Sequence, residues 1–344
     1  MASVVVVGAG VTGLVTAIGC ALAGHRVTVL DRGPIPNPAS TSSDQHRALR
    51  VLRPDDLDGT RRMAEARRRW LELESLLQTR IFRPVGVVTA CTPDEFDLAL
   101  DTAGQVGLPA VAVSPDALPP VVFPAGTSGV FDPDAGVLLA DRFLRAAAEW
   151  LAAHPTVALR PRCAVAGVGD HQVALVDGTA LAADVVLVAA GPWNTDLVGL
   201  PVVLHRQTMV YLRPPRNLVG WWASAPGVGR IGADRRAWLL PPGGGTVLKI
   251  SSDAVCREVA TIADPDPEPW ADRLLAEPIL TDAADYAVLA VRDCHYATDP
   301  VTGGPVLTRI RPSVWSRPAC GGTGFSTAPL VAREILGAVM EVSA

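Results

Sequence analysis

Glycine spacing near the N-terminus is the first chemical signal in the sequence. Residues 8–13 read Gly-Ala-Gly-Val-Thr-Gly, directly after the β-branched run 3–7. A helix-compatible segment, 14–23, comes next, and a second predicted strand, 25–30, ends in Asp31. A strand, a glycine-rich turn, a helix and a second strand that ends in a carboxylate form a complete βαβ unit, which is typical of dinucleotide binding.

Each glycine of this turn has its own expected task. Gly8 permits the tight turn, Gly10 lets the backbone approach a pyrophosphate, and Gly13 lets the helix pack closely against the strand. The pyrophosphate would lie at the amide-rich N-terminus of the helix. Asp31 stands where a carboxylate accepts hydrogen bonds from ribose hydroxyls and disfavours a 2′-phosphate. The pattern alone leaves NAD and FAD open.

Lys249 is the second signal, because it is the only lysine among 30 basic residues. The abundance of Ala, Val, Gly and Pro indicates a high-GC coding bias that replaces dispensable lysines with arginine. Residues 238–250 read as a strand, a glycine turn and a returning strand, with Lys249 between two apolar residues. We therefore expect this lysine to lie within a strand.

Composition limits the class of protein. The chain has 344 residues, of which 49% are hydrophobic and 19% charged, so it can bury a large core and is expected to hold two intertwined domains. Its net charge of -5 argues against nucleic acid or an anionic membrane as the main partner and favours a small-molecule ligand. We expect no metal site, no signal peptide and no membrane span.

The six cysteines are scattered and form no CxxC pair, which excludes the usual zinc spacings and a small-protein disulfide framework. This usage predicts a reducing, cytoplasmic setting.

The chain beyond the first βαβ unit favours FAD over NAD. An NAD-dependent dehydrogenase would continue quickly into another strand and helix, whereas this chain continues into the polar loop 40–50 and a long Arg-rich helix with Trp70. We expect a helix at 141–154, a buried strand within 184–193, and a glycine-rich turn at 321–325 that opens the C-terminal helix.

In this order, these segments resemble the D-amino-acid oxidase superfamily of FAD-dependent oxidoreductases, most closely its monomeric sarcosine oxidase-like branch. The resemblance covers nearly the whole chain. It rests on the glycine fingerprint, the Ser-rich loop with Arg47 and Arg50, Gly-Val-Phe-Asp-Pro-Asp-Ala-Gly at 129–136, Ala-Ala-Gly-Pro-Trp at 189–193 followed by Arg206-Gln207, Cys-His-Tyr at 294–296, and Gly-Thr-Gly-Phe at 322–325.

The resemblance implies a mixed α/β fold. A Rossmann-like FAD-binding domain would be assembled from 1–82, 133–200 and 290–344. A second, predominantly antiparallel-sheet substrate domain, 83–132 and 201–289, would form a roof over the flavin.

The resemblance also implies the cofactor contacts. They fall at Gly8, Gly10, Val11, Thr12, Gly13, Asp31, Arg32, Ser42, Ser43, Arg47, Ala190, Gly191, Trp193, Cys294, Gly322, Thr323, Gly324, Phe325 and Ser326. In the family the sulfur at the position of Cys294 bonds to the 8α-methyl carbon of the flavin, which implies covalent FAD. The alternative is a buried structural cysteine. The other five cysteines are interpreted as packing residues.

For Lys249 the resemblance implies a place above the flavin face opposite the substrate, where the lysine activates O2. A preorganised cation stabilises the anion that develops when O2 accepts an electron. The alternative is a lysine retained by chance on a solvent-exposed strand.

On the substrate side, the family's carboxylate-binding arginine falls at Arg50, whose alternative is a solvated basic surface shared with Arg53, Arg61 and Arg62. The family's second carboxylate-binding lysine falls at Ser326, and its active-site histidine falls at Asp253. Half of the carboxylate clamp is therefore missing, so sarcosine itself is not the expected substrate. Asp253 either pairs with a substrate cation or is simply a polar residue at the end of a strand.

Further pocket candidates are the side chains at Trp221, Trp222, Arg230 and Trp238, although tryptophans at strand spacing also suit a core. Three histidines, His46, His205 and His295, are candidates for proton handling. No catalytic base is assigned, because a pocket that lowers the pKa of the substrate amine can suffice.

The sequence thus predicts a monomeric FAD-dependent oxidase of an amino acid or a secondary or cyclic amine, with hydride transfer to flavin N5, an imine product, and H2O2 from reoxidation by O2. The substrate would be free or tethered to a carrier protein. One alternative is a dehydrogenase of an amine or 2-hydroxy acid that passes electrons to a quinone or a protein. Another is a non-catalytic dinucleotide-binding regulatory protein.

Overall fold

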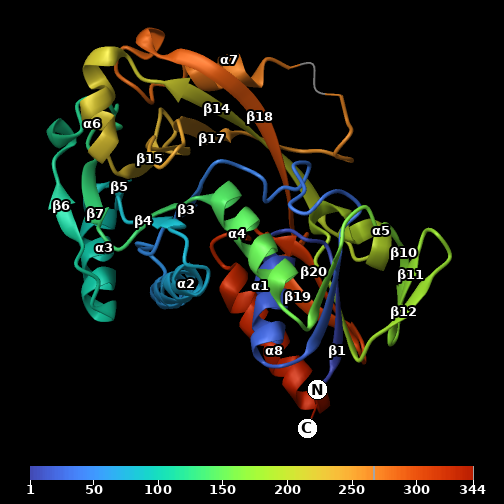
Figure 1. The fold of residues 1–344 in the computed structure, drawn as a ribbon. Helices are drawn as coiled ribbons and strands as arrows, with labels where there is room; N and C mark the ends of the chain where they lie inside the picture. The colour runs from blue at the N-terminus through green and yellow to red at the C-terminus, as the bar shows by residue number, and fades with distance from the viewer. Residues whose placement is uncertain (266–267, 344) are drawn as a thin grey trace.

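The βαβ unit predicted at the N-terminus is present in the computed structural model, which describes residues 1–265 and 268–343 (Figure 1). Strand β1 (Ser3–Val7) leads into helix α1 (Val11–Leu22), and β2 (Arg26–Leu30) runs parallel to β1. The helix begins three residues before its predicted start, since Gly10 is its N-cap. Its first turn is therefore formed by the fingerprint itself.

A six-stranded sheet surrounds this unit, in the order β19-β20-β13-β1-β2-β9. All neighbours are parallel except the edge pair β19 and β20. The added strands are β9 (Val157–Arg160), β13 (Val185–Val188), β19 (Pro305–Arg311) and β20 (Val314–Cys320). Strand β13 confirms the buried strand expected within 184–193. Parallel strands bring their carboxyl ends to one edge of the sheet, which is where a ligand binds in open α/β sheets.

Each face of this sheet is covered. Helices α1, α4 (Ala140–Ala153) and α8 (Ala328–Ser343) pack together on one face. The helix predicted at 141–154 is thus confirmed within one residue at each end. The other face packs against a small antiparallel sheet and α5 (Asn194–Val198). That sheet contains β10 (Val165–Gly169), β11 (Gln172–Leu175) and β12 (Ala180–Ala182).

A second, eight-stranded sheet has the order β18-β14-β17-β16-β15-β5-β7-β6 and is antiparallel except between β15 and β5. Its outer face packs against α6 (Val219–Ser224) and α7 (Trp270–Ala276) in a separate hydrophobic cluster. Its strands are β5 (Val87–Cys91), β6 (Val111–Val113), β7 (Ser128–Asp132), β14 (Val203–Arg213), β15 (Gly227–Ile231), β16 (Ala237–Leu240), β17 (Leu248–Glu258) and β18 (Ala287–Thr298). The predicted fold class, a Rossmann-like α/β part with a mainly antiparallel sheet, is confirmed.

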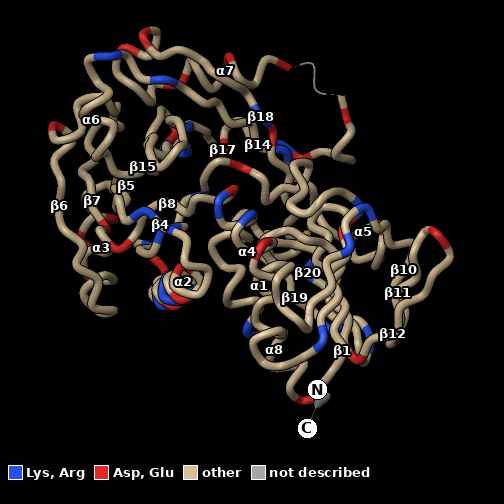
Figure 2. Tube along the Cα trace, in the orientation of Figure 1, with Lys and Arg blue, Asp and Glu red and all other residues tan. Residues whose placement is uncertain are grey.

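Two helices and a small sheet lie beside these sheets. They are α2 (Leu57–Leu76), α3 (Pro93–Val106), and the strands β3 (Arg47–Leu49), β8 (Gly136–Leu138) and β4 (Phe82–Arg83). Figure 2 shows positive and negative residues mixed along α2, the Arg-rich helix expected from the sequence. Arg69 forms ion pairs with Glu65 and Glu72, so part of this basic surface is neutralised within the helix itself.

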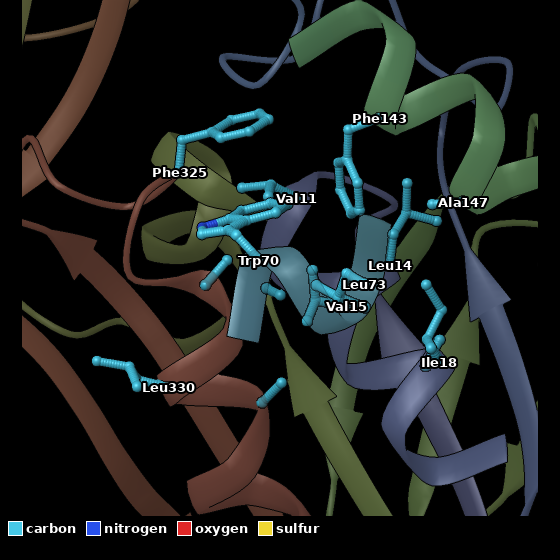
Figure 3. Packing of buried hydrophobic residues seen from close by; sticks show 14 of the residues in the cluster. Val11, Leu14, Val15, Ile18, Trp70, Leu73, Phe143, Ala147, Phe325 and Leu330 are labelled. Atoms are coloured by element: carbon cyan, nitrogen blue, oxygen red, sulfur yellow. The ribbon is translucent and has the colours of Figure 1, made fainter. Parts of the chain in front are cut away.

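An aromatic cluster joins α2 to the turn near the C-terminus (Figure 3). The Trp70 ring stacks on Phe325 at 5.5 Å and meets Phe143 edge-on at 4.8 Å. The Trp70 indole N–H also donates to the Ser326 carbonyl at 2.9 Å. Packing therefore fixes the position of the turn at 321–326.

That turn corrects one prediction. The C-terminal helix begins at Ala328 and not at the glycines, because Gly321 and Gly322 have φ values of +59° and +72°, which no right-handed helix contains. The predicted domain division is untested and stays a prediction; its boundary at residue 290 falls inside β18. Among the described residues, no helix combines the length and the apolar character that crossing a membrane requires.

Candidate active site

A cavity of about 920 Å³ opens where the two large sheets meet. Its floor consists of the turn after β1, the loop 40–56, the segment 189–197 and the turn 320–326. Inward-facing side chains of β14, β16, β17 and β18 line the opposite side. The cavity lies at the carboxyl edge of the parallel strands, and its volume falls in the range of cofactor and ligand sites.

The fingerprint glycines form a cradle in which Gly8 and Gly13 leave no room for a side chain. Gly8 has a φ of +105°, and a Cβ there would collide with the Ala189 carbonyl. A Cβ on Gly13 would collide with the carbonyl of Gly8, so this glycine permits close packing of α1 on β1. The Val11 amide donates to Ser42 Oγ at 2.9 Å, which joins the helix N-terminus to the Ser-rich loop. The backbone is thus open to the close approach that a pyrophosphate requires.

Asp31 is held firmly at the edge of this cradle. Its carboxylate accepts hydrogen bonds from the Ala9 amide at 3.0 Å, the Gly33 amide at 2.8 Å and Asn37 Nδ2 at 2.8 Å. A carboxylate has about four lone-pair sites, so one remains for a ribose hydroxyl. Nearby, the Arg32 guanidinium lies 4.0 Å above the Trp193 ring, which closes this end of the cavity.

The structure brings most of the predicted cofactor contacts to the cavity wall. Two do not reach it. Gly13 acts in packing between helix and strand, and Ser43 lines a smaller adjoining recess. The contacts that line the cavity are Gly8, Gly10, Val11, Thr12, Asp31, Arg32, Ser42, Arg47, Ala190, Gly191, Trp193, Cys294, Gly322, Thr323, Gly324, Phe325 and Ser326. This set fits a dinucleotide with a flavin ring.

Lys249 lies on β17 with its side chain 1% exposed, yet it lines the cavity. The alternative of a lysine on a solvent-exposed strand is therefore wrong. Its Nζ donates to the Asp44 carboxylate at 2.8 Å and to the His46 carbonyl at 2.6 Å. An ammonium has three N–H donors, so one remains for a group in the cavity.

Asp44 is the counter-ion of Lys249 and is itself 1% exposed. Its other oxygen accepts from the Tyr211 hydroxyl at 2.6 Å, and Arg47 lies 3.3 Å away. Burial alone would raise the pKa of Asp44, but the charges of Lys249 and Arg47 and the two hydrogen bonds hold that pKa below its usual range. Asp44 is therefore ionised at neutral pH. Burial lowers the pKa of Lys249, and the charge of Asp44 opposes that shift.

The Asp44→Asn variant is expected to lose about 3–5 kcal/mol of unfolding free energy at neutral pH, because a buried ammonium loses its counter-ion. The pKa of Asp44 is depressed in the folded state. Its contribution is therefore present above the unfolded pKa, about 3.9, and is lost as the pH falls through the folded pKa. Urea unfolding should show a constant deficit from about pH 5 to 8 that shrinks below about pH 4. An equal deficit in acid would contradict the assignment.

Cys294 lines the cavity on β18, with its sulfur 3.7 Å from an Arg47 terminal nitrogen. Arg47 also donates to the Thr41 carbonyl at 2.7 Å, so its guanidinium is fixed beside the sulfur. The sulfur is half-buried and forms no disulfide. Cys294 is thus a free thiol on the cavity wall beside the Arg47 guanidinium.

Arg50 and Asp253 face the cavity from two sides. The Arg50 guanidinium lies 6.0 Å from the Trp238 ring, and neither Arg50 nor Asp253 forms an ion pair in the described part of the chain. Both residues keep exposed surface. Partial loss of hydration lowers the pKa of Arg50, and the Asp253 charge opposes this. Partial loss of hydration raises the pKa of Asp253, and the Arg50 charge opposes that. Ser326 lines the cavity without supplying charge, since its hydroxyl donates to the Thr323 carbonyl at 3.0 Å.

The tryptophan pair of α6 corrects another expectation. Trp221 and Trp222 belong to the outer hydrophobic cluster and not to the cavity, because α6 packs on the far face of the sheet. Trp238 and Arg230 do line the cavity, although Arg230 already pairs with Glu95 at 3.2 Å.

The three histidines have different surroundings. His205 stacks on Tyr296 at 5.0 Å and contacts Thr298, away from the cavity. His295 lines the cavity and accepts a hydrogen bond from Arg206 at 3.0 Å; burial, with help from Arg206, lowers its pKa. His46 is fully buried beside Lys249, and burial holds its pKa well below the usual value. None is placed as an obvious base.

Three residues of the site, Asp44, Tyr211 and Arg317, were not among those predicted from the sequence. Asp44 was visible only as one acid in a polar loop, and it is separated from Lys249 by 205 positions. A buried lysine requires a counter-ion, so a search for an acid in the cofactor-binding loop would have been justified. No sequence signal marks Tyr211 or Arg317.

The fold and the cavity together define a dinucleotide-binding protein with a second sheet over the cofactor site. The family model described as DAO, FAD dependent oxidoreductase, matches residues 3–336. The chain therefore belongs to this family of FAD-dependent oxidoreductases.

Individual relatives are distant. The chain is 26% identical over 242 residues to peroxisomal sarcosine oxidase from Mus musculus, an alignment that covers 65% of this chain and 58% of that protein's length. Among solved structures, NikD, an unusual amino acid oxidase essential for nikkomycin biosynthesis, has a TM-score of 0.79 at 18% identity, covering 100% of this chain and 95% of NikD.

L-proline dehydrogenase from P. horikoshii has a TM-score of 0.82 at 17% identity, covering 98% of this chain and 93% of the other. Amadoriase I from Aspergillus fumigatus has a TM-score of 0.76 at 18% identity, covering 99% and 86%. At these identities the structural matches establish a shared fold.

Proposed function

We propose that this protein is an FAD-dependent oxidase of an amino acid or of a secondary or cyclic amine. A hydride leaves the C–H next to the substrate nitrogen, the substrate becomes an imine, and O2 is reduced to H2O2. Bound FAD supplies the hydride acceptor at N5. The cradle at residues 8–12, Asp31, the loop with Ser42 and the turns at 190–193 and 321–326 would hold this cofactor.

The observation that carries the choice of O2 as acceptor is the setting of Lys249. Two of its N–H donors are fixed by Asp44 and the His46 carbonyl, which leaves the third for the cavity. A fixed cation in a site with little water stabilises negative charge on O2 without reorganising when the charge appears. The compact ammonium also suits this task better than a planar guanidinium.

Arg50 would grip the substrate carboxylate, since a guanidinium offers two parallel hydrogen bonds to a carboxylate. Asp253, across the cavity, would face a substrate cation. Ser326 offers no second charge at the position where the resemblance expects a lysine, so sarcosine itself is not the proposed substrate. The names of the sarcosine oxidase relative and of NikD support an amine or amino-acid substrate. Whether that substrate is free or attached to a carrier protein stays open in this proposal.

Cys294 is proposed to hold the flavin through a thioether to its 8α-methyl carbon. Acid precipitation of the holoprotein should give a yellow pellet, and the intact mass should exceed that of the chain by one FAD. Cys294→Ser should give a colourless pellet, whereas Cys163→Ser, another cysteine on the cavity wall, should stay yellow. A colourless wild-type pellet would contradict the link.

A dehydrogenase that passes electrons to a quinone or a protein is the second candidate, favoured by the structural match to L-proline dehydrogenase. The two functions differ in their reaction with O2. Reduction of the holoprotein by an amine without O2, followed by rapid reoxidation and one H2O2 per substrate, supports the oxidase. Slow reoxidation by O2 together with rapid reoxidation by a quinone supports the dehydrogenase, and no reduction by any amine supports a non-catalytic protein.

A further inference from the structure

Arg317 is a cation on the cavity wall that the proposed function does not use. It lies on β20 and is 9% exposed, and its side chain lines the cavity together with the turn at 321–326. The pairing of β19 with β20 shifts between Thr308–Ser316 and Val306–Ala319, which places Arg317 in a local irregularity of the strand. Such a bulge redirects a side chain that regular alternation would point elsewhere.

The Arg317 guanidinium has no counter-ion in the described part of the chain. Its Nε is buried without a hydrogen-bond partner, and no carboxylate lies within ion-pair distance. Burial lowers the pKa of this group, and the nearby Cys320 and Glu334 oppose that shift without forming an ion pair with it. The Arg317 backbone carbonyl, by contrast, accepts a hydrogen bond from Asn194 Nδ2.

A buried cation without a partner is costly by several kcal/mol, so native proteins rarely keep one unless a bound group compensates it. Two other cavity arginines have a carboxylate partner: Arg47 contacts Asp44, and Arg230 contacts Glu95. Arg50 has no ion pair among the described residues either, but unlike Arg317 it is exposed. Ser326, in the turn that follows β20, supplies no charge. Because Arg317 lines the cavity, an anionic group of a bound molecule could supply the missing negative charge.

We infer that Arg317 binds an anionic oxygen of a cavity ligand and is a second ligand-binding cation of the cavity, in addition to Arg50. Two sources offer such an oxygen: a carboxylate of the substrate, and the C2 oxygen of the flavin pyrimidine ring, which gains negative charge on reduction. The inference rests on the proposed function in that it takes FAD and an amino acid as the occupants. If the carboxylate is the source, the preferred substrates carry one acidic group that both arginines bind, or two acidic groups that bind one arginine each.

The test compares wild-type holoenzyme with Arg317→Met, Arg317→Lys and, as the matched control, Arg62→Met, which removes a nearby exposed arginine outside the cavity. Binding of benzoate and succinate to the oxidised holoenzyme is measured by the change in flavin absorbance, without turnover. The flavin midpoint potential and the dissociation constant of sulfite are measured on the same samples. None of these readouts requires amine oxidation, so they stay informative if the proposed function fails.

Loss of a charge-assisted contact should raise an affected dissociation constant about ten- to a hundredfold. If the source is the substrate carboxylate, the carboxylate constants rise in Arg317→Met while the potential and the sulfite constant hold. If the source is the flavin, the potential falls and the sulfite constant rises while carboxylate binding holds. In either case Arg317→Lys should lie between Arg317→Met and wild type, and Arg62→Met should match wild type.

Values within twofold of wild type for all three probes in Arg317→Met would overturn the inference. If Arg317→Met does not fold, Arg317→Gln replaces it. The affected constant or potential in Arg317→Lys must then lie between the values of the wild type and of Arg317→Gln. Equal values for Lys and Gln would also overturn the inference.

Discussion

Replacing Lys249 with methionine is expected to slow the reoxidation of reduced holoenzyme by O2 about 10²–10³-fold, the cost of removing one preorganised charge-stabilising group. The rate of flavin reduction by substrate without O2 should change little, because the proposed substrate contacts are Arg50 and Asp253 and not Lys249. Methionine has a similar length and no charge, so the loss isolates the ammonium. The buried partner Asp44 is then left with Arg47 and the Tyr211 hydroxyl.

Stopped-flow measurement of the two half-reactions separates these effects. Leu248→Met is the matched control, since Leu248 is a fully buried neighbour in the same strand and does not line the cavity. An unchanged bimolecular rate with O2 in Lys249→Met would remove the lysine from the mechanism. Equal slowing of both half-reactions would indicate a structural lysine instead.

The second large effect is expected at Arg50. Arg50→Met should reduce kcat/KM for an amino-acid substrate about 10²–10³-fold, because the substrate carboxylate loses its charged, hydrogen-bonded partner inside the cavity. For the same amine without a carboxyl group, the wild type and the variant should differ little. The reoxidation rate with O2 should hold.

Steady-state kinetics with an acid and amine pair of otherwise equal shape measures this directly. Arg61→Met is the control, because Arg61 lies on α2, is exposed and pairs with Asp58. Equal effects at Arg50 and Arg61 would support the alternative interpretation, in which Arg50 belongs to a solvated basic surface. A loss in Arg50→Met that is the same for both members of the substrate pair would contradict the carboxylate contact.

The sequence predicted best where the signals are local. The glycine fingerprint determines its own turn, helix start and close packing, so the βαβ unit and the contacts around Gly8 and Gly13 follow from about 30 residues. The strand position of Lys249 likewise follows from its apolar neighbours and the glycine turn before it. These features depend on backbone geometry over a few residues.

Features that depend on tertiary contacts were not predictable. The Lys249–Asp44 pair joins residues 205 positions apart, and a single sequence contains no trace of that contact. Arg317 has no ion-pair partner because the fold brings no carboxylate of the described residues within ion-pair distance, and a sequence does not show this. Trp222 was expected near the cavity, but a helix places it on the outer face, where its indole N–H donates to the Tyr286 hydroxyl at 3.1 Å.

The predicted start of the C-terminal helix was wrong, and the reason is a local feature of the sequence. Two successive glycines at 321 and 322 favour left-handed backbone, which closes a turn before a helix can begin. The aromatic contact of Phe325 with Trp70 then holds that turn against α2. Glycine pairs at the edge of a cofactor site are thus better interpreted as a turn than as the first turn of a helix.

The central claim is that this FAD-dependent oxidoreductase oxidises an amine and uses O2. Its most direct test is anaerobic mixing of the holoprotein with a panel of L- and D-amino acids, N-methyl amino acids and cyclic imino acids, followed by admission of O2. We expect at least one compound to bleach the visible flavin absorbance, and O2 to restore it with one H2O2 per substrate. Bleaching only by 2-hydroxy acids, or reoxidation that requires a quinone, would contradict it.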